Sequence, residues 1–336
     1  MRKYKAAGWK SRQKIKSQIE SGRIAHSPDF WDMGAVLLFV LLIPYIISFF
    51  FGNVESEYVK DRNETTGFMV CNTTAAGTER MPMETYLMLR LPATIDMNYE
   101  PEVLKAQAVI LRTELMKAYE EGTEKEEQYI YMRSNILSAD GEEYEKSRKA
   151  VEETKGMYMA YNGSPIRAPY FAVSAGKTRN GNEAFRSEEY PYLKSVMCER
   201  DFMADGYIQT IQINEAVFWV KLKELYPEFT REAGKGIEEL LQIERDKSGY
   251  VTELIFGNMM VSGEAFRQAF SLNSAHFTLE EENNTFINDT IVIKTKGIGH
   301  GVGFSQYGAN EAAKKGSDFI DILNYFFTDI VMEKTE

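Results

Sequence analysis

The sequence predicts an α+β fold, with mixed sheets and helices in one extracytoplasmic domain behind an N-terminal transmembrane helix. Thr290–Lys296 alternates apolar and polar residues as a strand does, and Val251–Phe256 is predicted as a second strand. Val217–Phe229 has the amphipathic pattern of a helix. Because strands and helices follow one another without a regular βαβ repeat, an α+β domain is favoured over an α/β one. The chain of 336 residues, 44% hydrophobic and 26% charged, is long enough for such a domain.

The N-terminal segment predicts a membrane anchor. Residues 1–32 form a basic tail, and residues 33–52 carry no charge over a length that spans a hydrocarbon core. Acidic residues follow the span, so the positive-inside rule places the tail in the cytoplasm. A cleaved signal peptide is the alternative, but no small-x-small cleavage site follows the span. We therefore expect a single-pass protein of the cell membrane whose C-terminal domain is extracytoplasmic.

The outer part of the chain is acidic. Residues 53–65 are polar and predict a stalk, and residues 66–336 form the predicted domain. The formal net charge is −11 even with the basic tail included, so the domain itself is more acidic still. The negative electrostatic field of such a domain repels polyanions. This excludes nucleic acid as a partner class and disfavours tight binding of anionic polymers.

Cysteine and histidine are scarce. Cys71 and Cys198 are the two cysteines, and the sequence does not determine whether they form a disulfide. A nucleophile pair of Cys198 with His300 is an alternative, although neither neighbourhood has a thiol-enzyme signature. The three histidines form no metal-ligand cluster, so the sequence predicts neither a metal nor a cofactor.

A helix is predicted to start at Pro101, which is well placed as a first-turn proline. The residues that follow are mostly good helix formers, and Leu104, Ala108, Leu111 and Leu115 share one apolar stripe. Lys105 and Arg112 lie seven residues apart on another face. Together they could bind an acidic group or sugar oxygens, whereas isolated cations of this kind are more often solvated or salt-bridged.

The most informative stretch is the segment Gly297–Asn310, which has four glycines in its first seven positions. Glycine permits tight backbone bends and the close approach of another group. A strand precedes the segment, and a helix is predicted over Asn310–Lys315, so His300, Ser305 and Gln306 are expected on a strand-to-helix turn. The alternative is a glycine hinge with one buried, hydrogen-bonded histidine.

This segment, GIGHGVGFSQYGANEAAKKGSDFIDIL, closely resembles the C-terminal signature of the stage II sporulation protein D and amidase-enhancer family, G-x-G-H-G-V-G-M-S-Q-Y/W-G-A followed by a helix. Phe304 replaces the usual methionine. The resemblance continues upstream at Tyr86, Lys105–Ala108 and Arg112–Thr113, which match the family's blocks L-E-E-Y and E-A-L-K-A-Q-A-x-x-A-R-T. It implies a cell-wall protein that acts on peptidoglycan.

One position departs from the family in a way that affects chemistry. When the upstream block is aligned without gaps, the glutamate that is the catalytic acid of the family's lytic transglycosylases falls on Thr94. Glycosidic cleavage needs a carboxylic acid to protonate the leaving oxygen, and a threonine hydroxyl cannot serve near neutral pH. Asp96 is the candidate for a relocated acid. If the segment is a strand, Thr94 and Asp96 share one face, about 6–7 Å apart.

Two further blocks resemble the family. Tyr170–Thr178 is similar to F-x-S-S-S-G-G-x-T, and Tyr190–Val196 is similar to P-Y-L-x-S-V. Tyr192 could stack on a sugar ring or pack in the core. The residues that the resemblance and these side-chain chemistries together suggest for glycan binding are Lys105, Gln107, Arg112, Tyr192, His300, Ser305 and Gln306.

The resemblance implies a membrane-anchored protein that binds peptidoglycan glycan strands, with a role alongside a cell-wall amidase during sporulation and engulfment. In the first hypothesis it is an active lytic transglycosylase with an unusual acid such as Asp96. In the second, which Thr94 favours, it is a binder or amidase-recruiting scaffold with a weakened or lost site. A membrane-anchored sensor or assembly protein is the third.

Overall fold

The computed structural model describes residues 67–74, 77–122, 129–132, 141–230, 235–257, 259–282 and 289–335. Residues Thr66–Glu336 cluster into one compact unit. Within the described ranges, no helix has the length and apolar character needed to cross a membrane. The predicted tail 1–32, span 33–52 and stalk 53–65 lie outside the described residues.

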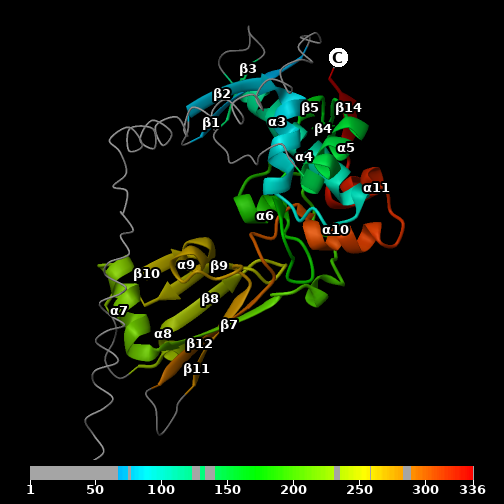
Figure 1. Ribbon diagram of the computed structural model, residues 1–336. Helices are drawn as coiled ribbons and strands as arrows, with labels where there is room; N and C mark the ends of the chain where they lie inside the picture. Colours follow the sequence, from blue (N-terminus) through cyan, green and yellow to red (C-terminus); the bar gives the residue numbers. More distant parts are fainter. Residues whose placement is uncertain are drawn as a thin grey trace, which may run out of the picture. The chain divides into compact units, whose positions relative to one another are not determined.

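Helices and several small sheets alternate irregularly, which confirms the predicted mixture of an α+β fold (Figure 1). The first group of elements surrounds one hydrophobic core. Its strands are β1 (Met69–Thr74), β2 (Gly77–Pro82), β3 (Tyr129–Met132), β4 (Met157–Tyr161), β5 (Ser164–Pro165), β6 (Tyr170–Phe171), β13 (Phe304–Ser305) and β14 (Val331–Lys334). Its helices are α3 (Met83–Arg90), the 3₁₀ helix η2 (Leu91–Ala93), α4 (Pro101–Glu121), α5 (Gly141–Glu153), α6 (Gly181–Phe185), the 3₁₀ helix η4 (Asp201–Met203), α10 (Gln306–Ala313) and α11 (Phe319–Phe326).

The second group of elements surrounds a separate core. Its strands form two antiparallel sheets, in the orders β11-β12-β7 and β10-β9-β8. They are β7 (Ile208–Asn214), β8 (Leu241–Arg245), β9 (Val251–Phe256), β10 (Met259–Ser262), β11 (Phe277–Glu282) and β12 (Thr290–Lys296), with helices α7 (Glu215–Leu225), α8 (Ile237–Leu240) and α9 (Gly263–Ala269). Stacked aromatic rings fill this core, among them Phe266 with Phe270 at 4.4 Å and Trp219 with Phe229 at 5.7 Å between centroids.

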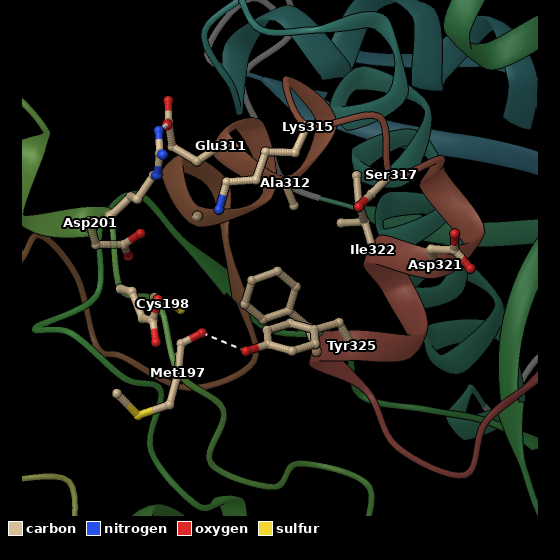
Figure 2. A pocket seen from close by; sticks show the side chains of 14 residues that line it. Met197, Cys198, Asp201, Glu311, Ala312, Lys315, Ser317, Asp321, Ile322 and Tyr325 are labelled. Carbon is tan, nitrogen blue, oxygen red and sulfur yellow. Dashed lines mark hydrogen bonds and ion pairs between the residues drawn. The ribbon is translucent and has the colours of Figure 1, made fainter.

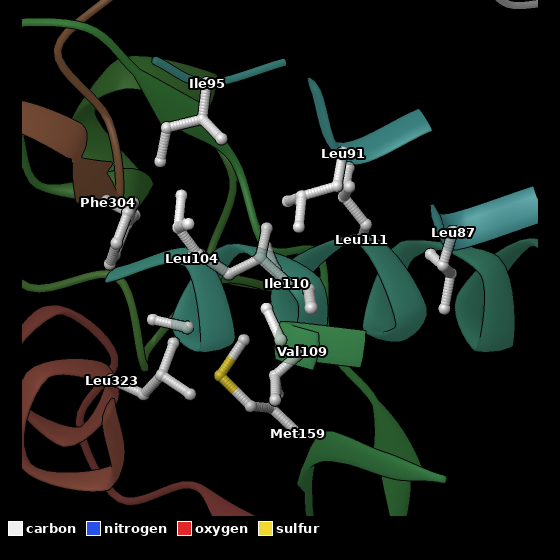
Figure 3. Packing of buried hydrophobic residues seen from close by; sticks show 14 of the residues in the cluster. Leu87, Leu91, Ile95, Leu104, Val109, Ile110, Leu111, Met159, Phe304 and Leu323 are labelled. Atoms are coloured by element: carbon white, nitrogen blue, oxygen red, sulfur yellow. The ribbon is translucent and has the colours of Figure 1, made fainter. Parts of the chain in front are cut away.

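Helix α4 is the centre of the first core. It begins at Pro101 as predicted, and most of its residues from Val103 to Met116 are buried. Figure 3 shows Leu104, Val109 and Ile110 packed among Phe304, Leu323 and Met159, which come from β13, α11 and β4. Burial of each such side chain stabilises the fold by about 1.5–3 kcal/mol. The helix therefore holds together elements that are distant in the sequence.

Several local predictions are confirmed. Strands β12 and β9 have the predicted bounds. In addition, the Asn162-Gly163 pair forms the tip of the β4–β5 hairpin, with φ values of 51° and 80°. Helix α10 begins at Gln306 rather than at Asn310, because Phe304 and Ser305 first pair with β6 and the Ser305 side chain then caps the helix.

Residues 94–96 do not form a strand, which was the condition for Thr94 and Asp96 to share one face. Leu91–Ala93 form a 3₁₀ turn directly after α3, with Pro92 inside its first turn. Thr94 follows with φ −117° and ψ −18°, and its amide donates to the Leu91 carbonyl over 2.9 Å. The fixed φ of proline suits a helical first turn, so the chain tightens after α3 instead of extending.

Candidate functional site

The glycine-rich segment connects the two cores, since it follows β12 and leads into β13 and α10. Gly297, Gly299, Gly301 and Gly303 all have positive φ, between 78° and 111°. At Gly301 an added Cβ would lie 2.4 Å from the ring of Tyr250. Close packing and the left-handed backbone therefore both require glycine at these positions. This agrees with the tight bends and close approach expected from the glycine-rich sequence.

His300 is partly buried, and backbone groups use both of its ring nitrogens. Its Nε2 lies 3.0 Å from the Tyr170 carbonyl, and its Nδ1 accepts a hydrogen bond from the Val302 amide over 3.1 Å. This pairing requires the proton on Nε2 in the neutral ring. Burial lowers the pKa of His300, and the hydrogen bond to Tyr170 opposes that shift. The predicted alternative of a hydrogen-bonded histidine in a glycine hinge agrees with these contacts.

Ser305 and Gln306 point into the protein. Ser305 is fully buried, and its Oγ donates to Oδ2 of Asp201 over 2.7 Å. The Gln306 amide donates to the Thr94 carbonyl over 2.8 Å and to Oε1 of Gln107 over 3.2 Å. Gln107 is itself fully buried. These contacts hold the start of α10 against η2 and α4.

Thr94 and Asp96 differ in exposure. The Thr94 hydroxyl donates to the Leu91 carbonyl over 2.8 Å, so it closes its own 3₁₀ turn. Asp96 is exposed, and its Oδ1 accepts from both the amide and the side chain of Asn98, over 2.9 and 3.0 Å. The two side chains therefore do not share the face of a strand.

Lys105 and Arg112 both form ion pairs with glutamates, as the alternative for isolated cations predicts. Lys105 Nζ lies 2.6 Å from Glu102 and 2.8 Å from Glu153, at the edge of a pocket of about 380 Å³. Burial lowers the pKa of Lys105, but the two glutamates outweigh it, so the net shift is upward. Arg112 is fully buried and makes a bidentate pair with Glu84, over 2.9 and 2.6 Å.

Tyr192 belongs to the core, which was the second of its two predicted roles. Its side chain is buried, and its ring lies 5.5 Å from that of Tyr161. Its hydroxyl accepts from the Arg167 amide over 3.0 Å. Burial raises the pKa of Tyr192 to about 12.

The sequence did not point to Asp201, a fully buried carboxylate. It accepts from the Ser174 amide and from Ser305, both over 2.7 Å, and burial raises its pKa. Its Oδ1 is buried without a partner among the described residues. Its hydrogen-bond partners come from distant parts of the chain, so no local pattern could reveal its role.

Asp201 and Cys198 lie at the wall of a pocket of about 540 Å³ (Figure 2). Helices α10 and α11 form the opposite wall, where the Tyr325 hydroxyl donates to the Met197 carbonyl over 2.7 Å. Both cysteines are buried and free. Burial and the neighbouring Asp201 raise the pKa of Cys198 to about 12, so little thiolate forms at neutral pH. This disfavours the alternative of Cys198 as a nucleophile.

One carboxylate group in the second core could in principle hold a metal ion. Atoms of Glu215, Glu281 and Asp289 lie within 4.8 Å of one another. Two of the three already accept hydrogen bonds: Glu215 from the Trp219 indole over 2.7 Å, and Glu281 from the Ile237 amide over 3.0 Å. These contacts account for their positions without an ion.

Acidification is expected to weaken the fold through two partly buried histidines. The pKa values of His300 and His276 are both lowered from 6.5 by burial, so the unfolded chain binds more protons below that pH. Their stability contribution is therefore present above about pH 6.5 and is lost as pH falls through the folded pKa. Urea unfolding of the full chain at about pH 7.5 and 5.5 measures the effect, since these values bracket the histidine range.

The matched variants His300→Ala and His276→Ala should each show a smaller loss of unfolding free energy between these pH values than the wild type. The raised pKa values of Glu114 and Asp201 act in the opposite direction, but they are common to all three proteins. An unchanged pH dependence in both variants would contradict the prediction.

Comparison with known proteins agrees with the resemblance seen in the sequence. The family model described as Stage II sporulation protein matches residues 72–161, from β1 to β4. Stage II sporulation protein D of Bacillus subtilis (strain 168) is 30% identical over 275 residues, which cover 77% of this chain and 76% of that protein. Its counterpart in Bacillus amyloliquefaciens is 28% identical over 287 residues, covering 80% of this chain and 78% of that one. The amidase enhancer of Bacillus subtilis (strain 168) is 25% identical over 280 residues, or 70% of this chain and 39% of that protein. The 30% identity to the Bacillus subtilis stage II sporulation protein D extends over about three quarters of both chains. The chain therefore belongs to the stage II sporulation protein D family.

Proposed function

We propose that this protein binds the glycan strands of peptidoglycan from the outer side of the cell membrane and serves cell-wall remodelling during sporulation, with a weakened or lost transglycosylase site. The observation that supports this proposal most directly concerns Thr94. It occupies the position that the family resemblance assigns to the catalytic glutamate, and its hydroxyl is bound to the Leu91 carbonyl.

The chemistry of glycosidic cleavage explains the weight of this position. The leaving oxygen needs a proton, which a carboxylic acid of raised pKa normally supplies. A transglycosylase of this family uses one such acid, because a hydroxyl of the sugar itself attacks the anomeric carbon. Thr94 cannot replace it, since its hydroxyl does not ionise in the useful range.

The exposure of Asp96 favours a second candidate, an active lytic transglycosylase with a relocated acid. Asp96 lies two residues beyond Thr94, and solvent reaches its carboxylate. Its hydrogen bonds with Asn98 hold it in a turn that differs from an extended strand. A catalytic group displaced by about 1 Å can already lower the rate about 100-fold. This weighs against an acid that is displaced by two residues.

The partners and the location follow from the same proposal. One relative is named an amidase enhancer, which supports a wall amidase as the protein partner. Residues 33–52 would anchor the chain, with residues 1–32 in the cytoplasm and residues 66–336 facing the wall. The acidic composition of the chain suits a neutral glycan better than an anionic wall polymer.

The test incubates the full chain, in detergent micelles, with purified glycan strands and with intact peptidoglycan. We expect cosedimentation with peptidoglycan and no anhydro-muropeptides by mass spectrometry. Asp96→Asn should leave both results unchanged. Anhydro-muropeptides that disappear in Asp96→Asn, but persist in the exposed control Asp329→Asn, would instead establish the enzyme with a relocated acid. Absence of cosedimentation would overturn the proposal.

A further inference from the structure

A groove of about 600 Å³ lies beside α3 and α4. We call it the Glu114 groove. Its lining includes Tyr86, Arg90, Glu114, Tyr170, Phe185 and Tyr190. Its volume is within the range of about 300–1,000 Å³ that is typical of small-molecule sites. The glycine-rich segment also reaches it, through His300.

One wall of the Glu114 groove is aromatic. The Phe185 side chain is 46% exposed, and its ring lies 4.7 Å from that of Tyr190. The exposed Phe185 ring is therefore accessible to a ligand. Flat rings of this kind offer an apolar face, and tyrosine adds a hydroxyl that can form hydrogen bonds. The wall therefore suits a ligand with one apolar face and a polar rim.

Glu114 supplies a carboxylate beside these rings. Its Oε1 accepts a hydrogen bond from the Ala168 amide, and the described residues form no hydrogen bond to Oε2. Burial raises its pKa. A partly buried carboxyl with a free oxygen can accept from a ligand hydroxyl, or donate to one when it is protonated.

The charges of the Glu114 groove do not favour an anionic ligand. Arg167 pairs with Glu121 over 2.6 Å, so its charge is already partly neutralised. Arg90 lies near the Tyr170 hydroxyl, where it opposes the rise in the pKa of Tyr170 that burial causes. The Glu114 carboxylate, when ionised, offsets one further positive charge of the lining. Aromatic faces combined with dispersed donors and acceptors fit a neutral polyhydroxyl ligand best.

Five of the side chains expected to bind glycan, Tyr192 in the core among them, are unable to reach a ligand at the surface. Gln107, Arg112 and Ser305 are fully buried, and Gln306 is 7% exposed. They hold α4, α10 and the glycine-rich segment together. Of the predicted residues, Lys105 borders the pocket of about 380 Å³, where two glutamates pair with it, and His300 borders the Glu114 groove.

We propose that the Glu114 groove binds one or two pyranose rings of a neutral glycan, with the Phe185–Tyr190 wall against the apolar ring face and Glu114 hydrogen-bonded to ring hydroxyls. This inference rests on the proposed function and gives it a site. It assigns recognition to a surface separate from Thr94.

The experiment titrates the full chain in detergent micelles with the tetramer of N-acetylglucosamine and measures heat of binding. Phe185→Ala and Glu114→Gln should each weaken binding about tenfold, which corresponds to about 1.4 kcal/mol. Tyr325→Ala is the matched control, because Tyr325 is an exposed aromatic residue at the separate pocket of Figure 2. It should bind the tetramer as the wild type does. Circular dichroism confirms that each variant is folded, and Phe185 is exposed enough that its removal should spare the core.

The outcomes separate this inference from the proposed function. Wild-type cosedimentation with peptidoglycan, together with undiminished tetramer binding in both groove variants, would overturn the site and leave the function standing. Cosedimentation without any tetramer binding would likewise overturn it. If the wild type neither binds the tetramer nor cosediments with peptidoglycan, the proposed function and the proposed site are both overturned.

Discussion

Gly303→Ala should destabilise the fold by about 2–5 kcal/mol, the sum of a left-handed backbone penalty and overpacking. Gly303 has φ 78°, and a Cβ there would lie 2.2 Å from the Pro169 carbonyl oxygen. That oxygen cannot withdraw freely, since it accepts the Phe304 amide over 3.0 Å where β13 meets β6. Chemical denaturation of the full chain, followed by circular dichroism, measures the loss.

Gly316→Ala separates the two causes. Gly316 also has a positive φ, of 98°, but no atom lies within 4 Å of the place its Cβ would take. Gly316→Ala should lower the free energy of unfolding by the backbone penalty alone, about 1–2 kcal/mol. Equal losses in Gly303→Ala and Gly316→Ala would mean that close packing against Pro169 contributes nothing.

Arg112→Met should destabilise the fold by about 3–5 kcal/mol, the usual loss when one partner of a buried ion pair is removed. The Arg112 guanidinium is fully buried, bidentate with Glu84, and donates to the Met157 carbonyl over 3.0 Å. Its removal leaves the Glu84 carboxylate, 22% exposed, without its cation. Arg112→Lys should also be destabilising, because an ammonium cannot reproduce the planar fork.

A double-mutant cycle isolates the pair. Glu84→Gln in the Arg112→Met background should recover part of the loss, since no unpaired carboxylate then remains. Arg148→Ala is the exposed control, because Arg148 pairs with Glu145 and Glu152 at the surface and should change stability little. An Arg112→Met protein as stable as Arg148→Ala would show that the buried pair does not stabilise the fold.

These two predictions also indicate what the family's motif residues do in this chain. Arg112 and the glycines match the family pattern, and the structure uses them for packing and ion pairing. A sequence match identifies such positions without distinguishing a ligand contact from a structural one. The structure distinguishes them, because a fully buried side chain with its hydrogen bonds satisfied internally has no atom left for a ligand.

Local elements could be predicted wherever one physical rule dominated. The first-turn Pro101 and the apolar stripe after it determine α4, and the Asn162-Gly163 pair determines its hairpin. The conformation of the segment after α3 could not be predicted, and a strand was considered there only as a condition. In that segment, Pro92 is compatible with both a turn and an extended chain, and the 3₁₀ turn forms where Gln306 binds the Thr94 carbonyl.

By itself the sequence determined the family, the need for glycine before β13 and the central helix. Tertiary structure alone decided which polar residues are internal and which face a groove. Ser305 meets Asp201 across 104 residues, and Gln306 meets Gln107 across 199. Burial of a polar group depends on such distant partners, since without them its desolvation is too costly. No local pattern in the chain records those partners, and for the same reason none pointed to the groove at Glu114.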